Sequence, residues 1–273
     1  MIIHNRLQDI TLISIDCGNS YITYYMLKSL FKINSKLKII ILCIKDNNYL
    51  DLLKEFENKV EIIKLFNDKN IEKYLNDGEY SACHSYAIKY LVDNYITSEY
   101  FLLCDNDIIF SNLSILTKNY RNYDIIGYYD ENYYNEIFNI LHNMEMNNLT
   151  KYSEVDFKNV KPFHFNCDYK KYSFYSYKNM KVFLRYVPYY ILIKTNIFKK
   201  YFSQYIVSGK HKNNYYYIDT LSLFTFNILK NKCKILNFDI TNDILHIGNS
   251  TNKYSKIEYE KKLNTAKHNT IYT

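Results

Sequence analysis

Apolar runs alternate with amphipathic segments along the first hundred residues. Residues 9–16 (DITLISID) and 37–45 (LKIIILCIK) are short and rich in β-branched residues, which is typical of buried strands. Residues 21–34 carry apolar side chains at helical spacing, and residues 49–58 do the same after the second strand. This alternation predicts an α/β fold in which a parallel sheet is covered by helices on both faces.

The next strands and the helix between them continue this pattern. We predict a strand over residues 60–66, a helix over 82–96 and a further buried strand that begins near residue 100. Open α/β sheets bind their ligands at the carboxyl ends of the strands. Four aspartates follow predicted strands and are therefore expected at that edge of the sheet: Asp16, Asp46, Asp105 and Asp107.

The pattern changes beyond residue 111. Three strands and one helix are predicted in this second part, over residues 124–130, 182–194, 233–238 and 220–231 respectively. Between them, residues 131–180 are polar and rich in Tyr and Asn, with a single candidate helix at 136–148. The chain has no linker rich in Pro, Gly or Ser. We therefore expect two halves, residues 1–111 and 112–273, that share one core.

Composition narrows the class of protein. A chain of 273 residues with 48% hydrophobic content is long and apolar enough to fold around a large core. It has no apolar run long enough to span a membrane, and its N-terminus lacks the layout of a signal peptide, so we expect a cytoplasmic protein. The six cysteines are scattered without a C-x-x-C pair, which favours reduced structural thiols.

The charge pattern indicates an anionic ligand. The net charge of +7 comes mostly from lysines that are dispersed among 28 acidic residues. Nucleic-acid readers cluster Arg and Lys on one face, so we do not expect a nucleic-acid partner. A nucleoside diphosphate suits this charge, as does peripheral contact with an anionic membrane surface.

The sequence YFLLCDNDIIF at residues 100–110 carries the clearest candidate chemistry. Two aspartates, Asp105 and Asp107, stand where an apolar strand gives way to a turn. Buried carboxylates are costly unless a cation or hydrogen bonds compensate them. Paired carboxylate oxygens suit Mg²⁺ or Mn²⁺ carrying the phosphates of a nucleotide. A solvated Asp-Asn-Asp turn is the alternative interpretation.

The segment around this motif resembles the central part of GT-A fold glycosyltransferases, especially family-two-like enzymes. In residues 84–110 a helix leads through Ser-Glu-Tyr into a strand that ends in D-x-D. Three later stretches, RYVPYYILIKT (185–195), YIDTLSLF (217–224) and DILHIGNST (243–251), resemble later parts of such enzymes in the same order. The resemblance implies a single α/β domain with a Rossmann-related, mostly parallel sheet. Residues 1–111 would then bind a nucleotide sugar, and residues 112–273 would bind the acceptor.

Carried over residue by residue, the resemblance implies a metal site and a donor site. Asp107 would be the principal metal ligand, Asp105 would reach the metal or the donor ribose, and His246 would be a further ligand. An ordinary packed histidine is the alternative for His246. Asp16 and Asp46 would face the base and ribose, although either is also explained as a turn-forming aspartate.

Three other residues complete the predicted site. Asp219 would be the catalytic base that takes a proton from the acceptor hydroxyl, as an inverting transfer requires. A helix N-cap also explains it, and the usual Glu-Asp form of the motif is replaced here by Ile218-Asp219. Arg185 and His84 would contact the diphosphate or the acceptor, with a helix-surface position as the alternative for His84.

These observations predict a metal-dependent glycosyltransferase, expected to be inverting. Its donor would be a UDP- or GDP-linked sugar, its cofactor Mn²⁺ or Mg²⁺, and its acceptor a glycan or lipid-linked molecule. One alternative is a nucleotidyltransferase that makes nucleotide sugars, but CGNSYITYY after the first strand lacks the Gly-rich, basic loop that it would need. Another is a non-catalytic module that binds glycans or proteins.

Overall fold

The structure is a computed structural model of the whole chain. It describes residues 9–33, 36–77, 80–128, 161–163, 174–177, 180–183, 189–202, 208–211, 214–217, 220–221, 224–225, 227–228, 231–247, 257, 260–261 and 264.

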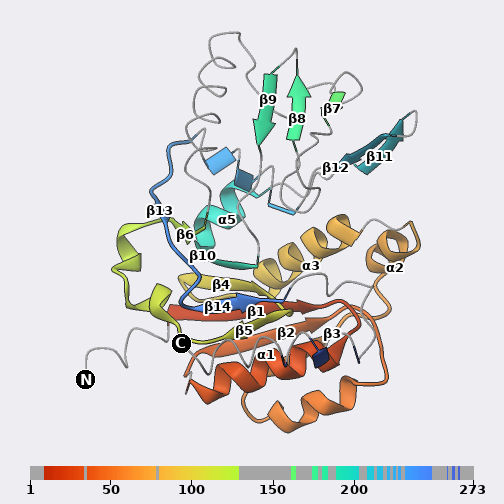
Figure 1. Cartoon of the computed structure of the whole chain (residues 1–273), viewed down its shortest axis with the longest axis vertical. Helices are drawn as coiled ribbons and strands as arrows, with labels where there is room; N and C mark the ends of the chain where they lie inside the picture. Colours follow the sequence, from red (N-terminus) through yellow and green to blue (C-terminus); the bar gives the residue numbers. More distant parts are fainter. Residues whose placement is uncertain are drawn as a thin grey trace.

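A seven-stranded mixed sheet forms the centre of the fold (Figure 1). Its strand order is β3-β2-β1-β4-β10-β6-β13, and β10 runs antiparallel to both of its neighbours while the other pairs are parallel. The strands are β1 (Ile10–Asp16), β2 (Lys38–Cys43), β3 (Glu61–Lys64), β4 (Tyr100–Asp105), β6 (Ile125–Gly127), β10 (Tyr190–Lys194) and β13 (Ile235–Asn237). The predicted α/β class with a mostly parallel sheet is confirmed.

Helices cover both faces of this sheet, as the continuous apolar strands predict (Figure 1). All seven residues of β1 are buried, and alternate residues point to opposite faces. Ile13 and Ile15 belong to a core cluster with α2, α3 and α5, whereas Ile10 and Leu12 belong to one with α1 and η2. These helices are α1 (Ser20–Lys32), the 3₁₀ helix η2 (Leu50–Phe56), α2 (Lys69–Asn76), α3 (Tyr80–Asn94) and α5 (Thr195–Tyr201).

Smaller elements follow the main sheet. Strand β5 (Ile108–Phe110) pairs with β14 (Ile244–His246) in an antiparallel ribbon. Two further sheets are drawn at the top of Figure 1. They comprise β7 (Lys161–Phe163), β8 (Phe174–Tyr177) and β9 (Met180–Phe183), and β11 (Ser208–His211) with β12 (Asn214–Tyr217). Short 3₁₀ helices, η3 (Ser114–Thr117) and η4 (Tyr120–Asn122), connect β5 to β6.

The structure differs from the predicted elements in several places. Residues 50–56 form a 3₁₀ helix, whose period of three fits the Lys54–Asp51 ion pair and the buried Leu53 and Phe56. Helix α2 was not predicted, although Asp68 is its N-cap and accepts hydrogen bonds from two backbone amides. The single strand expected over 182–194 is two strands, β9 and β10, in different sheets.

The remaining predictions for the second half have mixed outcomes. Phe224, Thr225, Asn227 and Ile228 are helical, as predicted for residues 220–231. The candidate helix at 136–148 lies outside the described residues. Both halves contribute to the core on the α1 face, where Leu192 and Phe238 join Leu12 and Met26. The boundary at residue 111 stays a prediction. Within the described part of the chain, no helix combines the length and apolarity needed to cross a membrane.

Candidate metal centre

The D-x-D motif stands at the carboxyl end of the central strand β4. Asp105 is the last residue of β4, which lies between β1 and β10, and Asp107 is in the turn that leads into β5. The five preceding residues of β4 are buried. The sheet therefore fixes the position of Asp105, and the turn carries Asp107 to the adjoining ribbon.

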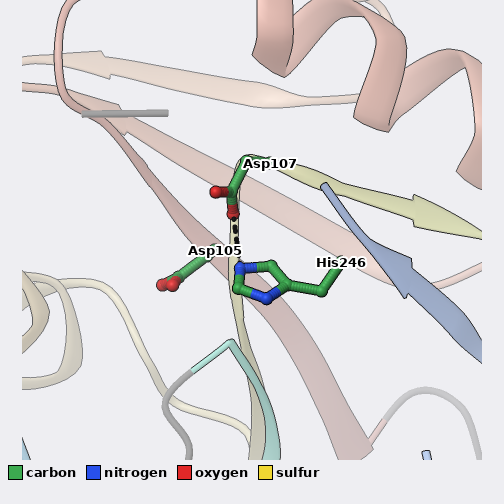
Figure 2. A group of neighbouring side chains, drawn as sticks. All are labelled: Asp105, Asp107 and His246. Carbon is green, nitrogen blue, oxygen red and sulfur yellow. Dashed lines mark ion pairs between the residues drawn. The ribbon is translucent and has the colours of Figure 1, made fainter. Parts of the chain in front are cut away.

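Pairing of β5 with β14 brings His246 to the same place from 139 residues further along the chain. The antiparallel register sets His246 opposite Ile108, and the amide of Ile247 donates to the carbonyl oxygen of Asp107 at 2.9 Å. Nε2 of His246 lies 3.3 Å from Oδ1 of Asp107. Figure 2 shows this contact as a dashed line, with the Asp105 side chain beside it.

These three side chains fit a divalent cation. Asp105, Asp107 and His246 each offer one ligand atom, and the three atoms lie within 4.8 Å of one another. The side chain of Asp107 is 5% exposed, whereas that of His246 is 33% exposed, so the group opens to solvent on one side. Two ionised carboxylates within 4.8 Å of each other repel by about 3 kcal/mol or more at an effective dielectric constant of 20, which a bound cation would offset.

A buried carboxylate, Asp243, anchors the strand that carries His246. Asp243 is fully buried and accepts hydrogen bonds from the amides of Ser114 and Ile115, at 3.0 and 2.9 Å. The hydroxyl of Tyr190 donates to the same carboxylate at 2.8 Å. Burial, with Asp243 nearby, raises the pKa of Tyr190 well above its ordinary value. Asp243 therefore fixes the start of β14, a role that nothing in its local sequence indicates.

Tyr189 links the two sides of the centre. Its backbone carbonyl accepts a hydrogen bond from the amide of Asp105 at 3.3 Å, and its ring stacks on the imidazole of His246. Sequence reasoning missed this residue, which appears only as one of many tyrosines in an apolar stretch.

His84, on α3, lies beside Asp105. Its Nε2 is 3.7 Å from Oδ1 of Asp105, and its Nδ1 is 3.4 Å from the hydroxyl of Thr220. The imidazole faces the D-x-D motif, so the alternative of a solvated helix surface does not describe its surroundings. Its predicted contact with a donor stays a prediction.

Asp16 and Asp46 are not part of this cluster. Asp16 is fully buried, and Asp46 is exposed, with a hydrogen bond to the amide of Asn47. Their predicted contacts with a base and ribose stay predictions. Arg185 and Asp219 lie outside the described residues.

The cysteines near the centre are protected thiols. Cys43, Cys83 and Cys104 are free and buried. Burial raises the pKa of Cys83 to about 12. The pKa of Cys17 is also raised, first by burial and then by carboxylates that include Asp16 and Asp105. A raised pKa disfavours the thiolate, which agrees with the predicted structural role.

A cavity of about 520 Å³ lies apart from the candidate metal centre. Its walls come from η3, η4 and the segment from β13 to Asn242, and they include Lys118, Tyr123 and Phe238. None of the predicted site residues that the structure describes lines it, so its size does not bear on the metal centre.

Comparisons with known proteins give structural likeness only. No family model matches the chain, and no curated protein matches it in sequence. Among solved structures it is similar to the mannosyltransferase PcManGT from Pyrobaculum calidifontis in complex with GDP-Man and Mn²⁺. That match has a TM-score of 0.49 and 7% identity, over 89% of this chain and 58% of that one.

Two further solved structures are also similar. S. aureus TarS matches with a TM-score of 0.47 and 13% identity, over 86% of this chain and 36% of that one. The galactosyltransferase LgtC, in complex with donor and acceptor sugar analogues, matches with a TM-score of 0.44 and 10% identity, over 85% of this chain and 73% of that one. The chain thus spans well under two thirds of the first two proteins. PcManGT and LgtC are by name a mannosyltransferase and a galactosyltransferase, and at such scores the matches assign no activity to this chain.

Proposed function

We propose that this chain is a metal-dependent glycosyltransferase that moves a sugar from a nucleotide-sugar donor to a glycan or lipid-linked acceptor. One observation carries the proposal. Asp105, Asp107 and His246 come from two segments far apart in the sequence and meet at the carboxyl end of β4, with their ligand atoms within 4.8 Å. Open α/β sheets bind their ligands at this edge.

Asp105, Asp107 and His246 would hold the cation. Carboxylate oxygens suit both Mg²⁺ and Mn²⁺, and the imidazole favours Mn²⁺ because Mg²⁺ prefers oxygen ligands. When bound, the cation would supply positive charge to the departing nucleoside diphosphate. The polypeptide holds the two sides of the cluster in place through the main sheet on one side and the β5–β14 ribbon on the other.

The remaining residues have proposed roles around this cation. His84 faces Asp105 and Thr220 and would border the space between the donor and the acceptor. Asp219, which directly precedes Thr220, would take the proton of the acceptor hydroxyl in an inverting transfer. Arg185 would meet the diphosphate, and Asp46 the ribose.

Ligand binding and turnover together test the proposal. The chain is incubated with UDP- and GDP-linked sugars and either Mn²⁺, Mg²⁺ or a chelator, and its melting temperature is recorded. We expect one nucleotide class to raise the melting temperature only with the metal, because a ligand at 100 times its Kd stabilises by about 2.7 kcal/mol. Release of nucleoside diphosphate from the same donor then separates an enzyme from a binding module.

Two results would contradict the proposal. Nucleotide binding that is equally strong in chelator would remove the metal from the account. Release of inorganic pyrophosphate from a nucleoside triphosphate and a sugar phosphate, without sugar transfer, would instead identify a nucleotidyltransferase.

A further inference from the structure

The middle residue of the D-x-D motif is buried and bonded to a different part of the chain. Asn106 is 6% exposed, and its amide Nδ2 donates to the hydroxyl of Thr23, in α1, at 3.1 Å. The Thr23 hydroxyl in turn donates to Oδ2 of Asp16, at the end of β1, at 2.9 Å. Three elements that approach the candidate metal centre are therefore joined by side chains: β1, α1 and the β4–β5 turn.

This series of hydrogen bonds ends at the buried carboxylate of Asp16, which accepts hydrogen bonds on both oxygens. Oδ1 of Asp16 accepts the amides of Gly18 and Asn19, at 2.8 and 3.0 Å, immediately before α1 begins. With the Thr23 hydroxyl on Oδ2, both oxygens of Asp16 therefore have donors. Asp16 is fully buried, and its side chain is held by donors from the chain itself.

The direction of each bond follows from the chemistry of the groups. An ionised carboxylate only accepts, so Thr23 must give its single proton to Asp16. The hydroxyl oxygen then presents its lone pairs to Asn106, whose amide nitrogen can only donate. Bonds arranged in series polarise one another, and the bond to the carboxylate is charge-assisted. The side chain of Asn106 is thereby fixed in one orientation.

We propose that Asp16, Thr23 and Asn106 form a positioning chain that sets the geometry of the D-x-D turn for a divalent cation. The inference rests on the proposed function and deepens it, because Asn106 stands between the two carboxylates that would bind the cation. Fixing its side chain fixes the backbone from which Asp105 and Asp107 project. In this proposal Asp16 acts on the metal centre through Thr23 and Asn106 and needs no direct contact with the ligand.

Binding of Mn²⁺ alone, followed by its paramagnetic resonance signal, tests this chain without requiring turnover. Asn106→Ala removes the amide and leaves the Thr23–Asp16 bond in place. Thr23→Val removes the hydroxyl at nearly constant shape, and Thr23→Ser keeps it. We expect the first two variants to weaken Mn²⁺ binding by about 10- to 100-fold, the usual effect of losing a residue that orients a metal ligand. Thr23→Ser should bind close to wild type.

A matched control comes from the other end of strand β4, near its first residue, Tyr100. Thr195 is buried and donates its hydroxyl to the carbonyl of Ser98 at 2.8 Å. It follows Lys194, which pairs with Tyr100 at the end of β4 away from Asp105. Thr195→Val deletes a bonded, buried hydroxyl just as Thr23→Val does, and it should leave Mn²⁺ affinity unchanged.

The variants separate positioning from a purely structural role. Melting temperatures are measured without metal, and Mn²⁺ titrations are made well below them. If the Asn106→Ala protein has a lower melting temperature but binds Mn²⁺ with wild-type affinity, the inference is wrong. The double variant of Thr23→Val and Asn106→Ala should lose no more Mn²⁺ affinity than the weaker-binding single variant, because both interrupt one chain. Additive losses would also contradict it.

Asp107→Asn distinguishes failure of this inference from failure of the proposed function. If Asp107→Asn abolishes Mn²⁺ binding while Asn106→Ala and Thr23→Val bind normally, the positioning chain is wrong and the metal centre stands. If wild-type protein does not bind Mn²⁺, the metal centre and the positioning chain that depends on it are both wrong.

Discussion

Tyr189 stacks on His246, with ring centroids 4.1 Å apart and ring planes inclined by 17°. The backbone carbonyl of the same tyrosine accepts the amide of Asp105. One residue therefore contacts both sides of the candidate metal centre. Its ring restricts the rotation of an imidazole that is 33% exposed.

Replacing the Tyr189 ring should allow the imidazole of His246 to rotate more freely. Tyr189→Leu keeps the strand and the carbonyl bond but removes the flat surface, so we expect Mn²⁺-dependent nucleotide binding to weaken by about 10-fold, the lower end of losses for residues that orient ligands. Tyr189→Phe keeps the stacking and should bind like wild type. Calorimetric titration of UDP or GDP with Mn²⁺ checks both variants, and equal affinity in Tyr189→Leu would show that the ring does not orient the ligand.

Asp107→Asn should abolish metal-dependent nucleotide binding while leaving the metal-free fold at least as stable. Removing one of two neighbouring carboxylates relieves repulsion when no cation is bound, although the contact with His246 offsets part of this gain. Denaturant unfolding in chelator is the measurement. A large loss of stability would instead indicate that Asp107 is a structural turn residue.

Asp219→Asn separates a catalytic base from a helix cap. Asn caps helices about as well as Asp, so stability should change by less than about 1 kcal/mol. Turnover with saturating donor and acceptor should nevertheless fall by roughly 10²- to 10⁴-fold, the usual contribution of a positioned proton acceptor. Donor affinity should hold, because the base contacts the acceptor. Turnover equal to wild type would remove Asp219 from the mechanism and would indicate either a retaining enzyme or a base supplied by another residue.

Stability should decline on the alkaline side. Burial raises the pKa of Tyr100 to about 12 and that of Cys83 to about 12 in the folded state. The unfolded chain therefore releases these protons at lower pH, so the stability that they contribute is complete below about pH 8 and is lost as pH rises toward 12. Cys83→Ala should flatten the fall in unfolding free energy across this range. An unchanged slope would show that Cys83 does not contribute.

Much of the central fold could be predicted because its strands and helices have distinct periods. Continuous β-branched runs identified β1 and β2, and helical spacing identified α1 and α3. The direction of each strand relative to its neighbours could not be predicted from this pattern. A buried apolar run such as β10 has the same sequence pattern in a parallel and in an antiparallel pair. The error over residues 50–56 has a similar origin, because burial at i and i+3 suits both α and 3₁₀ helices.

The candidate site was predicted only in part. Asp105 and Asp107 stand out because acids interrupt an apolar run, and His246 was proposed from the resemblance. The bond between Asn106 and Thr23 joins residues 83 positions apart, and no local pattern signals such a contact. Asp243 and Asp16 each look like ordinary turn residues in sequence, whereas folding buries both and surrounds them with donors.

The position of the metal is the most direct test of the account. Crystals grown with Mn²⁺ and UDP or GDP would be measured at the manganese absorption edge, where the ion gives an anomalous signal. We predict one strong peak, about 2.0 to 2.4 Å from a carboxylate oxygen of Asp107 and a ring nitrogen of His246, with Asp105 beside it. A bound nucleotide without an anomalous peak at this cluster, or a peak held by other residues, would contradict the proposed metal centre.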